Sequence, residues 1–386
     1  MFPQNRRDSY ACSWIAFVPI LFHFLEMENP TLKGNVATPG RAAVSNRQGR
    51  FEAHDREYLH DGWDIEEELT PLRTEVSIER PRKVITRNTS PDLSFDRSIN
   101  PYRGCEHGCI YCFARPTHAF LGMSPGLDFE TKLIARPDAP DILERELRAK
   151  SYAPKTIAIG TNTDPYQPIE KKHRIMRRIL EVLRAYRHPV GIVTKGSLIE
   201  RDVDLFGEMG RMGLARVGIS LTTLDPDVAR RMEPRVPSPD RRLKTIERLT
   251  EAGCPVRVMV SPVVPALTDH ELEAVLTRAA DAGAVAASWI MLRLPREVSE
   301  LFQEWLQTHF PDRAKRIMGR VRDLHGGQDY DPEWGRRLRG EGPFADLIAH
   351  RFAIHCRKLG LDRDLAPLRT DLFEPPARKG DQLSLF

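Results

Sequence analysis

The stretch that decides the fold reads RGCEHGCIYC and covers residues 103–112 of the 386-residue chain. It contains Cys105, Cys109 and Cys112 in the spacing C-x3-C-x2-C. Three thiolates on so short a loop can converge on one metal centre, and the two glycines of the stretch let the backbone turn sharply between them. A structural zinc site takes four protein ligands, and a four-iron cluster normally takes four cysteines. A cluster held by these three would leave one iron open to a small molecule.

The composition is that of a globular protein. Hydrophobic residues make up 41% and charged residues 29%, which excludes wholesale disorder and a fibrous structure. The 58 basic and 54 acidic residues give a net charge of +4, so the chain as a whole is only mildly basic. The other three cysteines, Cys12, Cys254 and Cys356, are scattered, unlike those of a secreted disulfide scaffold. This pattern predicts a cytoplasmic protein with one metal site.

Outward from the cysteine stretch, short β-branched runs alternate with longer amphipathic runs. The alternation predicts an α/β fold with six βα units, in which a parallel sheet is covered by helices. Ligands in such folds bind at the carboxyl ends of the strands. The expected strands are a first one near residues 93–98 and five more at 156–160, 190–194, 215–222, 256–260 and 286–292. Apolar residues on one helical face predict helices between them, at Ile175, Ile179, Val182 and Leu183 and at Leu272, Val275, Leu276 and Ala279.

Four regions are predicted along the chain. Residues 1–92 form an N-terminal extension that is partly disordered, with a basic, flexible run at 35–51. Residues 93–310 form the α/β core. Residues 311–361 form a basic helical C-terminal region with a helix near 343–359, and residues 362–386 form a flexible tail.

The first 26 residues leave three interpretations open. The longest uncharged stretch, residues 9–25, falls short of the about 20 apolar residues that a membrane-spanning helix needs. Two arginines before it imitate a signal peptide, but no small-x-small cleavage site follows. Translation that begins at Met27 would make residues 1–26 a misassigned start. In the second interpretation residues 1–26 are an interfacial or packed segment, and in the third they are a signal peptide. No association with a membrane is expected.

The cysteine spacing resembles that of the radical S-adenosylmethionine (SAM) superfamily, and Tyr111 agrees with the aromatic residue usual before the last cysteine. The resemblance implies a partial (βα)6 barrel of the TIM type over about residues 95–300. It also implies a 4Fe-4S cluster whose open iron chelates SAM, and an electron donor such as flavodoxin or ferredoxin. The reduced cluster would cleave SAM and release a 5′-deoxyadenosyl radical. The alternative is a zinc site completed by His107 or His118.

The stretch NPYRGC at residues 100–105 and later segments look closest to a bacterial group related to spore photoproduct lyase. By this resemblance Lys195 meets the carboxylate of SAM, and Ser220 hydrogen-bonds its ribose. Asn162, Asp164 and Arg235 lie at the same predicted rim, where they are candidate cofactor-binding residues. The same residue types also form helix caps and turns.

The chain departs from the lyase in one respect. Spore photoproduct lyase carries an additional cysteine near the end of its second strand, which returns a hydrogen atom to the product radical. The comparable residues here, 158–161, read AIGT. The chain is therefore not expected to be that lyase. Tyr102, Tyr111 or Tyr166 would supply the hydrogen instead, and Tyr111 and Tyr166 are the candidate catalytic residues.

The sequence ends in QLSLF, which resembles the short peptide by which bacterial polymerases and repair factors dock on the DNA sliding clamp. Gln382, Leu383, Leu385 and Phe386 would make the contacts. With the arginine-rich residues 313–339, this peptide favours DNA as partner and damaged DNA as substrate.

Two other functions remain open. One is a radical SAM enzyme, lyase-like or transferase-like, that modifies RNA, protein or a small molecule. The other is a non-catalytic metal-binding adaptor that docks on replication proteins.

Overall fold

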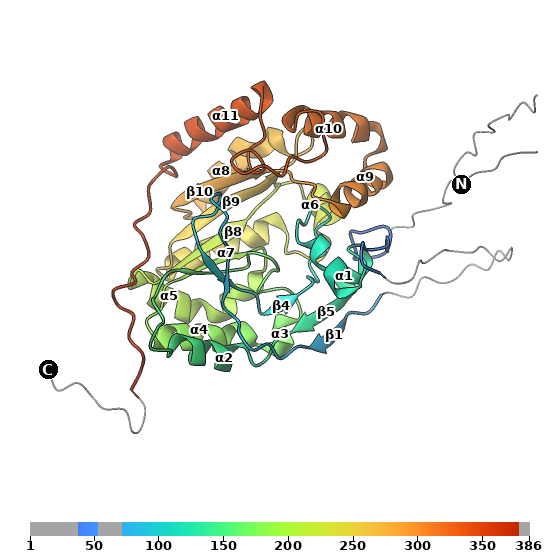
Figure 1. Cartoon of the computed structure of the whole chain (residues 1–386). Coiled ribbons are helices and arrows are strands. Elements are labelled where there is room, and N and C mark those ends of the chain that lie inside the picture. The colour runs from blue at the N-terminus through green and yellow to red at the C-terminus, as the bar shows by residue number, and fades with distance from the viewer. Residues whose placement is uncertain (1–37, 53–71, 378–386) are drawn as a thin grey trace, which may run out of the picture. The chain divides into compact units, whose positions relative to one another are not determined.

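The computed structural model describes residues 38–52 and 72–377. Its main sheet has seven strands in the order β10-β9-β8-β7-β6-β3-β2 (Figure 1). Six of them run parallel and in chain order, and β2, at the edge of the sheet, pairs antiparallel with β3. The predicted α/β fold with a parallel sheet is confirmed. The strands are β2 (Thr86–Arg87), β3 (Arg97–Ile99), β6 (Ile157–Ile159), β7 (Val190–Thr194), β8 (Ala215–Ser220), β9 (Val256–Val263) and β10 (Ala286–Met291).

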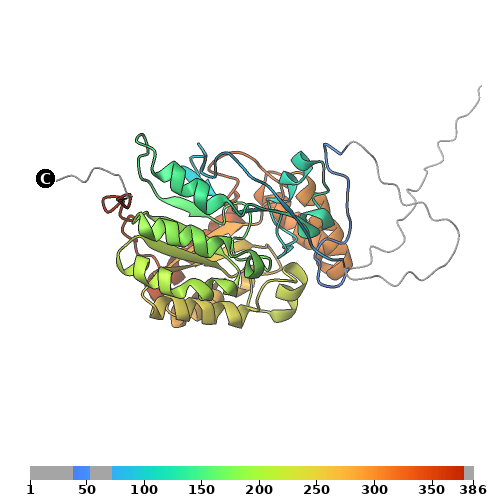
Figure 2. The same cartoon turned by 90° about the horizontal axis from the view of Figure 1, so that it is seen from below.

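Helices connect the strands and cover the outside of the sheet (Figures 1 and 2). The amphipathic pattern explains the packing, because the side chains predicted to face the sheet in α8 are all buried against it. In α4, Ile175, Ile179 and Leu183 are buried, whereas Val182 is half-buried. The helices of the core are α2 (Ala139–Leu147), α3 (Glu170–His173), α4 (Ile175–Ala185), α5 (Val203–Arg211), α6 (Pro226–Met232), α7 (Pro239–Glu251), α8 (Leu272–Asp281) and α9 (Glu297–His309).

The first strand lies later than the sequence predicted. Residues 91–96 form turns and bends, and only Arg97–Ile99 pair with β6. Leu93, which the prediction placed in the strand, is 38% exposed. Pro91 and Asp92 are turn-forming residues, and they delay the strand until the buried residues that follow.

A second, three-stranded sheet joins the N-terminal extension to the cysteine stretch. In this sheet β5 (Lys132–Ala135) pairs parallel with β1 (Glu75–Ile78) and antiparallel with β4 (Tyr102–Arg103). Strand β4 ends two residues before Cys105. A short helix, α1 (Leu127–Thr131), leads into β5. The start of the cysteine loop is therefore anchored between residues far apart in sequence.

Residues 38–52 are packed on the core rather than flexible. The side chain of Arg41 is buried, and so are the neighbouring Ala42 and Ala43. The two other arginines of this segment pair with carboxylates of α9, Arg47 with Glu304 at 2.9 Å and Arg50 with Glu297. The prediction of a flexible basic run overlooked these distant acids, because the segment itself contains none before residue 52.

The C-terminal region is helical, with α10 at Pro311–Leu324 and α11 at Pro343–Leu359. Several of its arginines pair within the chain, including Arg322 with Asp329 at 2.7 Å and Arg337 with Asp92 at 2.6 Å. Its basic charge is thus partly neutralised by nearby carboxylates.

After α11 the chain runs down one side of the barrel (Figure 1). The sequence predicted a flexible tail from residue 362, yet residues 362–377 make specific contacts. The backbone N–H of Arg369 donates to Gly213 at 2.9 Å, and that of Glu374 donates to Tyr186 at 3.1 Å. Phe373 packs against Tyr152 and His188, with ring centroids 5.6 and 5.5 Å apart. These aromatic contacts give the segment a surface on which to bury its apolar side chains.

Two predictions lie outside the described residues, namely those on residues 1–26 and on the C-terminal peptide QLSLF. Within the part of the chain that the structure describes, no helix is both long and apolar enough to cross a membrane.

Candidate active site

The cysteine loop folds as two tight turns that follow β4. The N–H of Gly108 donates to the carbonyl of Cys105 at 3.1 Å, and the N–H of Cys112 donates to that of Cys109 at 3.2 Å. Gly104 and Gly108 have φ angles of 71° and 64°, a region that other residues rarely adopt. A Cβ on Gly104 would also lie 2.7 Å from the side chain of Leu133. Both glycines therefore do what the sequence predicted.

The three thiols share one environment. Cys105 and Cys109 are buried, and Cys112 is half-buried between the apolar clusters that contain them. Burial raises the pKa of Cys105 well above its ordinary value, and the nearby Asp164, Cys109 and Cys112 raise it further. Three thiolates so close together are unfavourable unless a cation lies among them. A metal centre supplies that charge and deprotonates the thiols that bind it.

The donor set fits a cluster better than a single ion. Among residues 38–52 and 72–377, no group of three or more His, Cys, Asp or Glu side chains is arranged to hold one metal ion. In a four-iron cluster each cysteine binds a different iron, so the sulfurs need not meet at one point. Of the two histidines of the zinc alternative, His107 places Nδ1 3.3 Å from Asp164, and His118 places Nε2 2.9 Å from the carbonyl of Lys132.

Asp164 joins the cysteine loop to the ends of β6 and β7. Its Oδ1 accepts hydrogen bonds from the Thr194 hydroxyl at 2.6 Å and the Tyr166 N–H at 2.9 Å, and its Oδ2 accepts one from the Lys195 N–H at 2.7 Å. Burial alone would raise the pKa of Asp164, but His107 and these donors outweigh it and lower the pKa to about 2. The carboxylate is thus occupied by the protein itself, and it positions the loop.

Lys195 lies among acidic groups at the end of β7. Burial alone would lower the pKa of its ammonium group, but Cys109 and Glu233 raise it above the ordinary value. Its Nζ lies 5.7 Å from the ring centroid of Tyr111. The side chain is therefore a charged amine in contact with the cysteine region, as expected of a residue that meets a carboxylate.

Tyr111 is held by a buried acid. Its hydroxyl donates to Glu233, at the end of α6, and lies 3.3 Å from the hydroxyl of Thr222. Glu233 also pairs with Arg242 of α7 at 2.7 Å, and both side chains are about 1% exposed. The phenol is therefore fixed next to the third cysteine, with its hydroxyl directed toward Glu233.

The other three predicted cofactor-binding residues lie on the same side of the barrel. The hydroxyl of Ser220 donates to the carbonyl of Ser261 at 3.0 Å. The backbone N–H of Asn162 donates to Asn100 at 3.2 Å. Arg235 pairs with Glu106 of the cysteine loop at 2.8 Å. Their roles toward SAM stay predictions.

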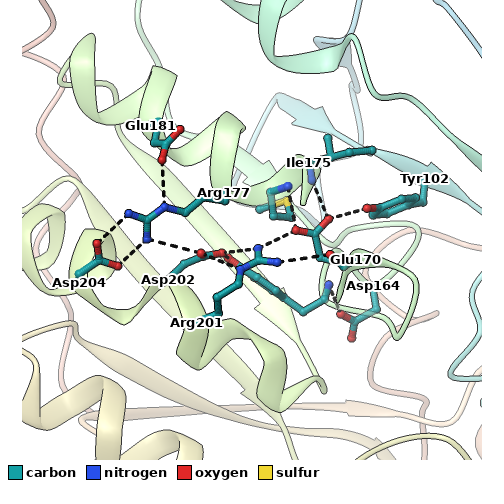
Figure 3. Close-up of polar contacts among 11 residues, drawn as sticks. Tyr102, Asp164, Glu170, Ile175, Arg177, Glu181, Arg201, Asp202 and Asp204 are labelled. Carbon is teal, nitrogen blue, oxygen red and sulfur yellow. Dashed lines mark hydrogen bonds and ion pairs between the residues drawn. The ribbon is translucent and has the colours of Figure 1, made fainter. Parts of the chain in front are cut away.

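Tyr166 is placed differently from Tyr111. Its ring is buried in the main core, and its hydroxyl donates to Asp202 at 3.0 Å. Asp202 belongs to a network of charges with Arg201 and Glu170 beside α3 and α5, as Figure 3 shows. The hydroxyl of Tyr102 ends in the same network, on Glu170. These contacts give both phenols a structural use, and a hydrogen-donating role for Tyr166 stays a prediction.

Several residues that support the loop were not among the predicted site residues. Gln167 accepts from the Glu106 N–H at 2.8 Å and donates to the Gly104 carbonyl at 3.2 Å. Arg115 and Glu130 form an ion pair in which both side chains are 0% exposed. The sequence offered one signal for two of them: Arg115 and Gln167 each lie within three residues of a predicted site residue.

Comparison with known proteins shows which family has this site. The model of the radical SAM superfamily matches residues 99–279. An uncharacterized protein of Mycobacterium tuberculosis is 36% identical over 285 residues, which make up 73% of this chain and 83% of that protein. The chain belongs to the radical SAM superfamily. Members of this enzyme superfamily use a 4Fe-4S cluster and SAM, so the predicted enzyme class and cofactors agree with the family. An uncharacterized protein of Methanocaldococcus jannaschii is 28% identical over 174 residues, which make up 45% of this chain and 62% of that protein.

Solved structures of spore photoproduct lyase share the fold of this radical SAM protein. One mutant structure has a TM-score of 0.54 and 16% identity, and the match covers 74% of this chain and 79% of the lyase. Another, with bound AdoMet and dinucleoside spore photoproduct, has a TM-score of 0.52 and 15% identity over 74% of this chain and 78% of the lyase. The predicted likeness to the lyase is confirmed at the level of the fold.

Proposed function

We propose that this radical SAM enzyme acts on nucleic acid, with damaged DNA as the substrate. Cys105, Cys109 and Cys112 would hold a 4Fe-4S cluster, which would supply the electron for reductive cleavage of SAM to methionine and a 5′-deoxyadenosyl radical. The chain's own residues bind and orient: Lys195 meets the carboxylate of SAM, Ser220 meets its ribose, and Asn162 and Arg235 line the rim. Tyr111, next to the third cysteine in the sequence, would supply the hydrogen atom.

A cleft at the start of α9 carries this proposal. It has a volume of about 850 Å³ and lies between the start of α9 and residues 328–337. Its residue Leu294 packs in the same cluster as Cys109 and Tyr111. The preceding residue, Arg293, holds its guanidinium 4.6 Å from the ring centroid of Phe113, which is 48% exposed. An exposed aromatic ring and arginines beside the site suit a nucleotide base and its phosphates.

Unpaired cations on two neighbouring helices support an anionic substrate. Arg296 at the start of α9 lines the cleft, is exposed, and forms no ion pair with another described residue. Lys315 and Arg316 on α10 are also exposed and form no ion pair within the described part of the chain. Solved spore photoproduct lyase structures with a similar fold contain a dinucleoside spore photoproduct. Backbone phosphates are the natural partners of such free cations.

The test is formation of 5′-deoxyadenosine by anaerobically reconstituted protein with dithionite and SAM. We expect ultraviolet-damaged duplex DNA to stimulate it more than undamaged DNA, RNA or no polymer. In Lys315→Gln/Arg316→Gln, the log–log salt dependence of DNA binding should become shallower by about 2, because each lost phosphate contact contributes about one. The matched control is Arg357→Gln/Lys358→Gln at the end of α11, where both residues are exposed.

Three results would contradict the proposal. Stimulation by RNA alone would assign the substrate to RNA, and equal rates with every polymer would favour a protein or a small molecule. A protein that binds metal but never cleaves SAM would be an adaptor.

For partners we propose the DNA sliding clamp, bound through Gln382, Leu383, Leu385 and Phe386. The support is the sequence of this peptide alone. We expect immobilised clamp to retain the full chain and to lose a variant that ends at Asp381. Equal recovery of the two would remove the proposal, and the SAM-cleavage rate of both proteins serves as the control for folding.

A further inference from the structure

A fully buried arginine holds the backbone between the cysteines. The Arg115 side chain is 0% exposed. Its Nη2 donates to the carbonyl of Gly108 at 2.8 Å, and its Nε donates to the carbonyl of Cys109 at 3.0 Å. Its Nη1 donates to the carbonyls of Pro125 and Gly126 at 3.1 and 3.0 Å. The planar guanidinium therefore fixes the two peptide groups on either side of Cys109.

Glu130 is the counterion of this arginine and packs directly against the loop. It is also 0% exposed and accepts from Arg115 Nη2. A Cβ added to Gly108 would lie 2.6 Å from Glu130 Oε2, so the glycine lets the loop backbone approach the carboxylate. The ion pair and the loop thus form one closely packed unit.

The N-terminal segment completes the hydrogen bonding of Glu130. The N–H of Ala42 donates to Oε2 at 3.2 Å, and the N–H of Ala43 donates to Oε1 at 3.0 Å. Arg41 donates to the backbone carbonyl of Glu130 at 2.8 Å. Segment 41–43 lies 87 to 89 residues before Glu130 in the sequence, and nevertheless supplies three of its donors.

The same segment reaches the loop by a second route. Arg41 Nη2 donates to the hydroxyl of Thr74 at 3.0 Å. That hydroxyl donates to Glu106 at 2.6 Å, and Glu106 pairs with Arg235. Glu106 directly follows Cys105, so the start and the middle of the cysteine loop are both connected to residues 41–43 through side-chain contacts.

The location of this network argues for a role in positioning. A buried ion pair adds little net stability, because removing two charges from water costs about as much as their attraction returns. A pair kept only for the fold could end on any backbone group. Here two of the four carbonyls that Arg115 binds are those of Gly108 and Cys109, next to a metal-binding side chain. Outer contacts of this kind orient the ligands of metal sites and tune the metal.

We propose that residues 41–43, Glu130 and Arg115 form a cradle that sets the position of Cys109 in the cluster site. The N-terminal segment is then a working part of the active site, although it lies outside the α/β core. This inference rests on cluster binding, which is part of the proposed function.

The test measures loss of iron to a chelator from the anaerobically reconstituted protein, together with the EPR spectrum of the reduced cluster. We expect Arg115→Lys to lose iron about tenfold faster than the unmodified chain and to show an altered spectrum. Lysine keeps the charge but cannot donate to four carbonyls and a carboxylate at once.

The matched control is Arg201→Lys, which also loses a guanidinium bound to a buried glutamate, Glu170. Its bonds, drawn in Figure 3, end on Glu170 and Asp202 rather than on the cysteine loop. It should release iron at the rate of the unmodified chain. A second variant, Arg41→Met, leaves the Arg115–Glu130 pair intact and should release iron a few times faster. If Arg115→Lys does not fold, Arg41→Met alone tests whether the cradle positions Cys109.

The outcomes separate this inference from the proposed function. If the unmodified chain holds a cluster and both variants match its iron-release rate and spectrum, the cradle is wrong and the proposed function stands. If both variants release iron faster but damaged DNA does not stimulate SAM cleavage, the cradle stands and the substrate is wrong. An unmodified chain that binds no cluster would remove both.

Discussion

Replacing Cys105, Cys109 or Cys112 singly with alanine should abolish iron binding and reduce 5′-deoxyadenosine formation to background. The chain offers three clustered thiols and no fourth cysteine close in sequence, so each loss leaves a cluster with two protein ligands. The fold should survive, because the loop is held by Arg115, Gln167 and backbone hydrogen bonds rather than by the thiols. Iron and sulfide content after anaerobic reconstitution measures the loss of the cluster, and circular dichroism checks that the fold survives.

Cys254→Ala and Cys356→Ala are the matched controls. Both thiols are buried in the main core, and burial raises the pKa of each to about 12, so they are neutral packing groups. These variants should keep full iron content and lose about 1 kcal/mol of stability from the small cavity. A triplet variant that retained the iron content and activity of the unmodified protein would contradict the assignment of that cysteine.

The parts of this molecule that the sequence predicted correctly are those with a local signal. Strand β7 and the buried face of α8 follow from short runs of apolar residues with a regular period. The cysteine loop follows from its spacing. In each case the information lies within about ten residues.

The parts that it missed depend on contacts between residues far apart in the chain. Glu130 shows no pattern around it, and its role depends on Ala42 and Ala43. Asp164 illustrates another limit. A polar residue after a strand predicts ligand binding, and the sequence does not reveal that both of its oxygens also accept hydrogen bonds from the protein. Sequence identifies which residues gather at the strand ends, and side-chain packing decides which of them stay available to a ligand.

A second large effect is expected at Glu233. Glu233→Gln should lower the free energy of unfolding by about 3 kcal/mol, since a buried cation that loses its partner is strongly destabilising. Arg242 and Glu233 are paired at 2.7 Å, and both are nearly inaccessible to solvent. Burial alone would raise the pKa of Glu233, but Arg242 and Lys195 outweigh it and lower the pKa, which favours the charged carboxylate. Urea unfolding of the cluster-free protein measures the effect.

Glu200→Gln is the matched control for Glu233→Gln. Glu200 also accepts from arginines, Arg241 and Arg248, but those two side chains are 37% and 57% exposed. Water can solvate cations at such exposure, so this variant should lose at most about 1 kcal/mol. If Glu233→Gln lost no more than Glu200→Gln, the charge of Glu233 would not be needed to neutralise Arg242 and Lys195. The hydrogen bonds that Glu233 accepts from Tyr111 and Thr222 would then be its remaining contacts, and glutamine would serve as well.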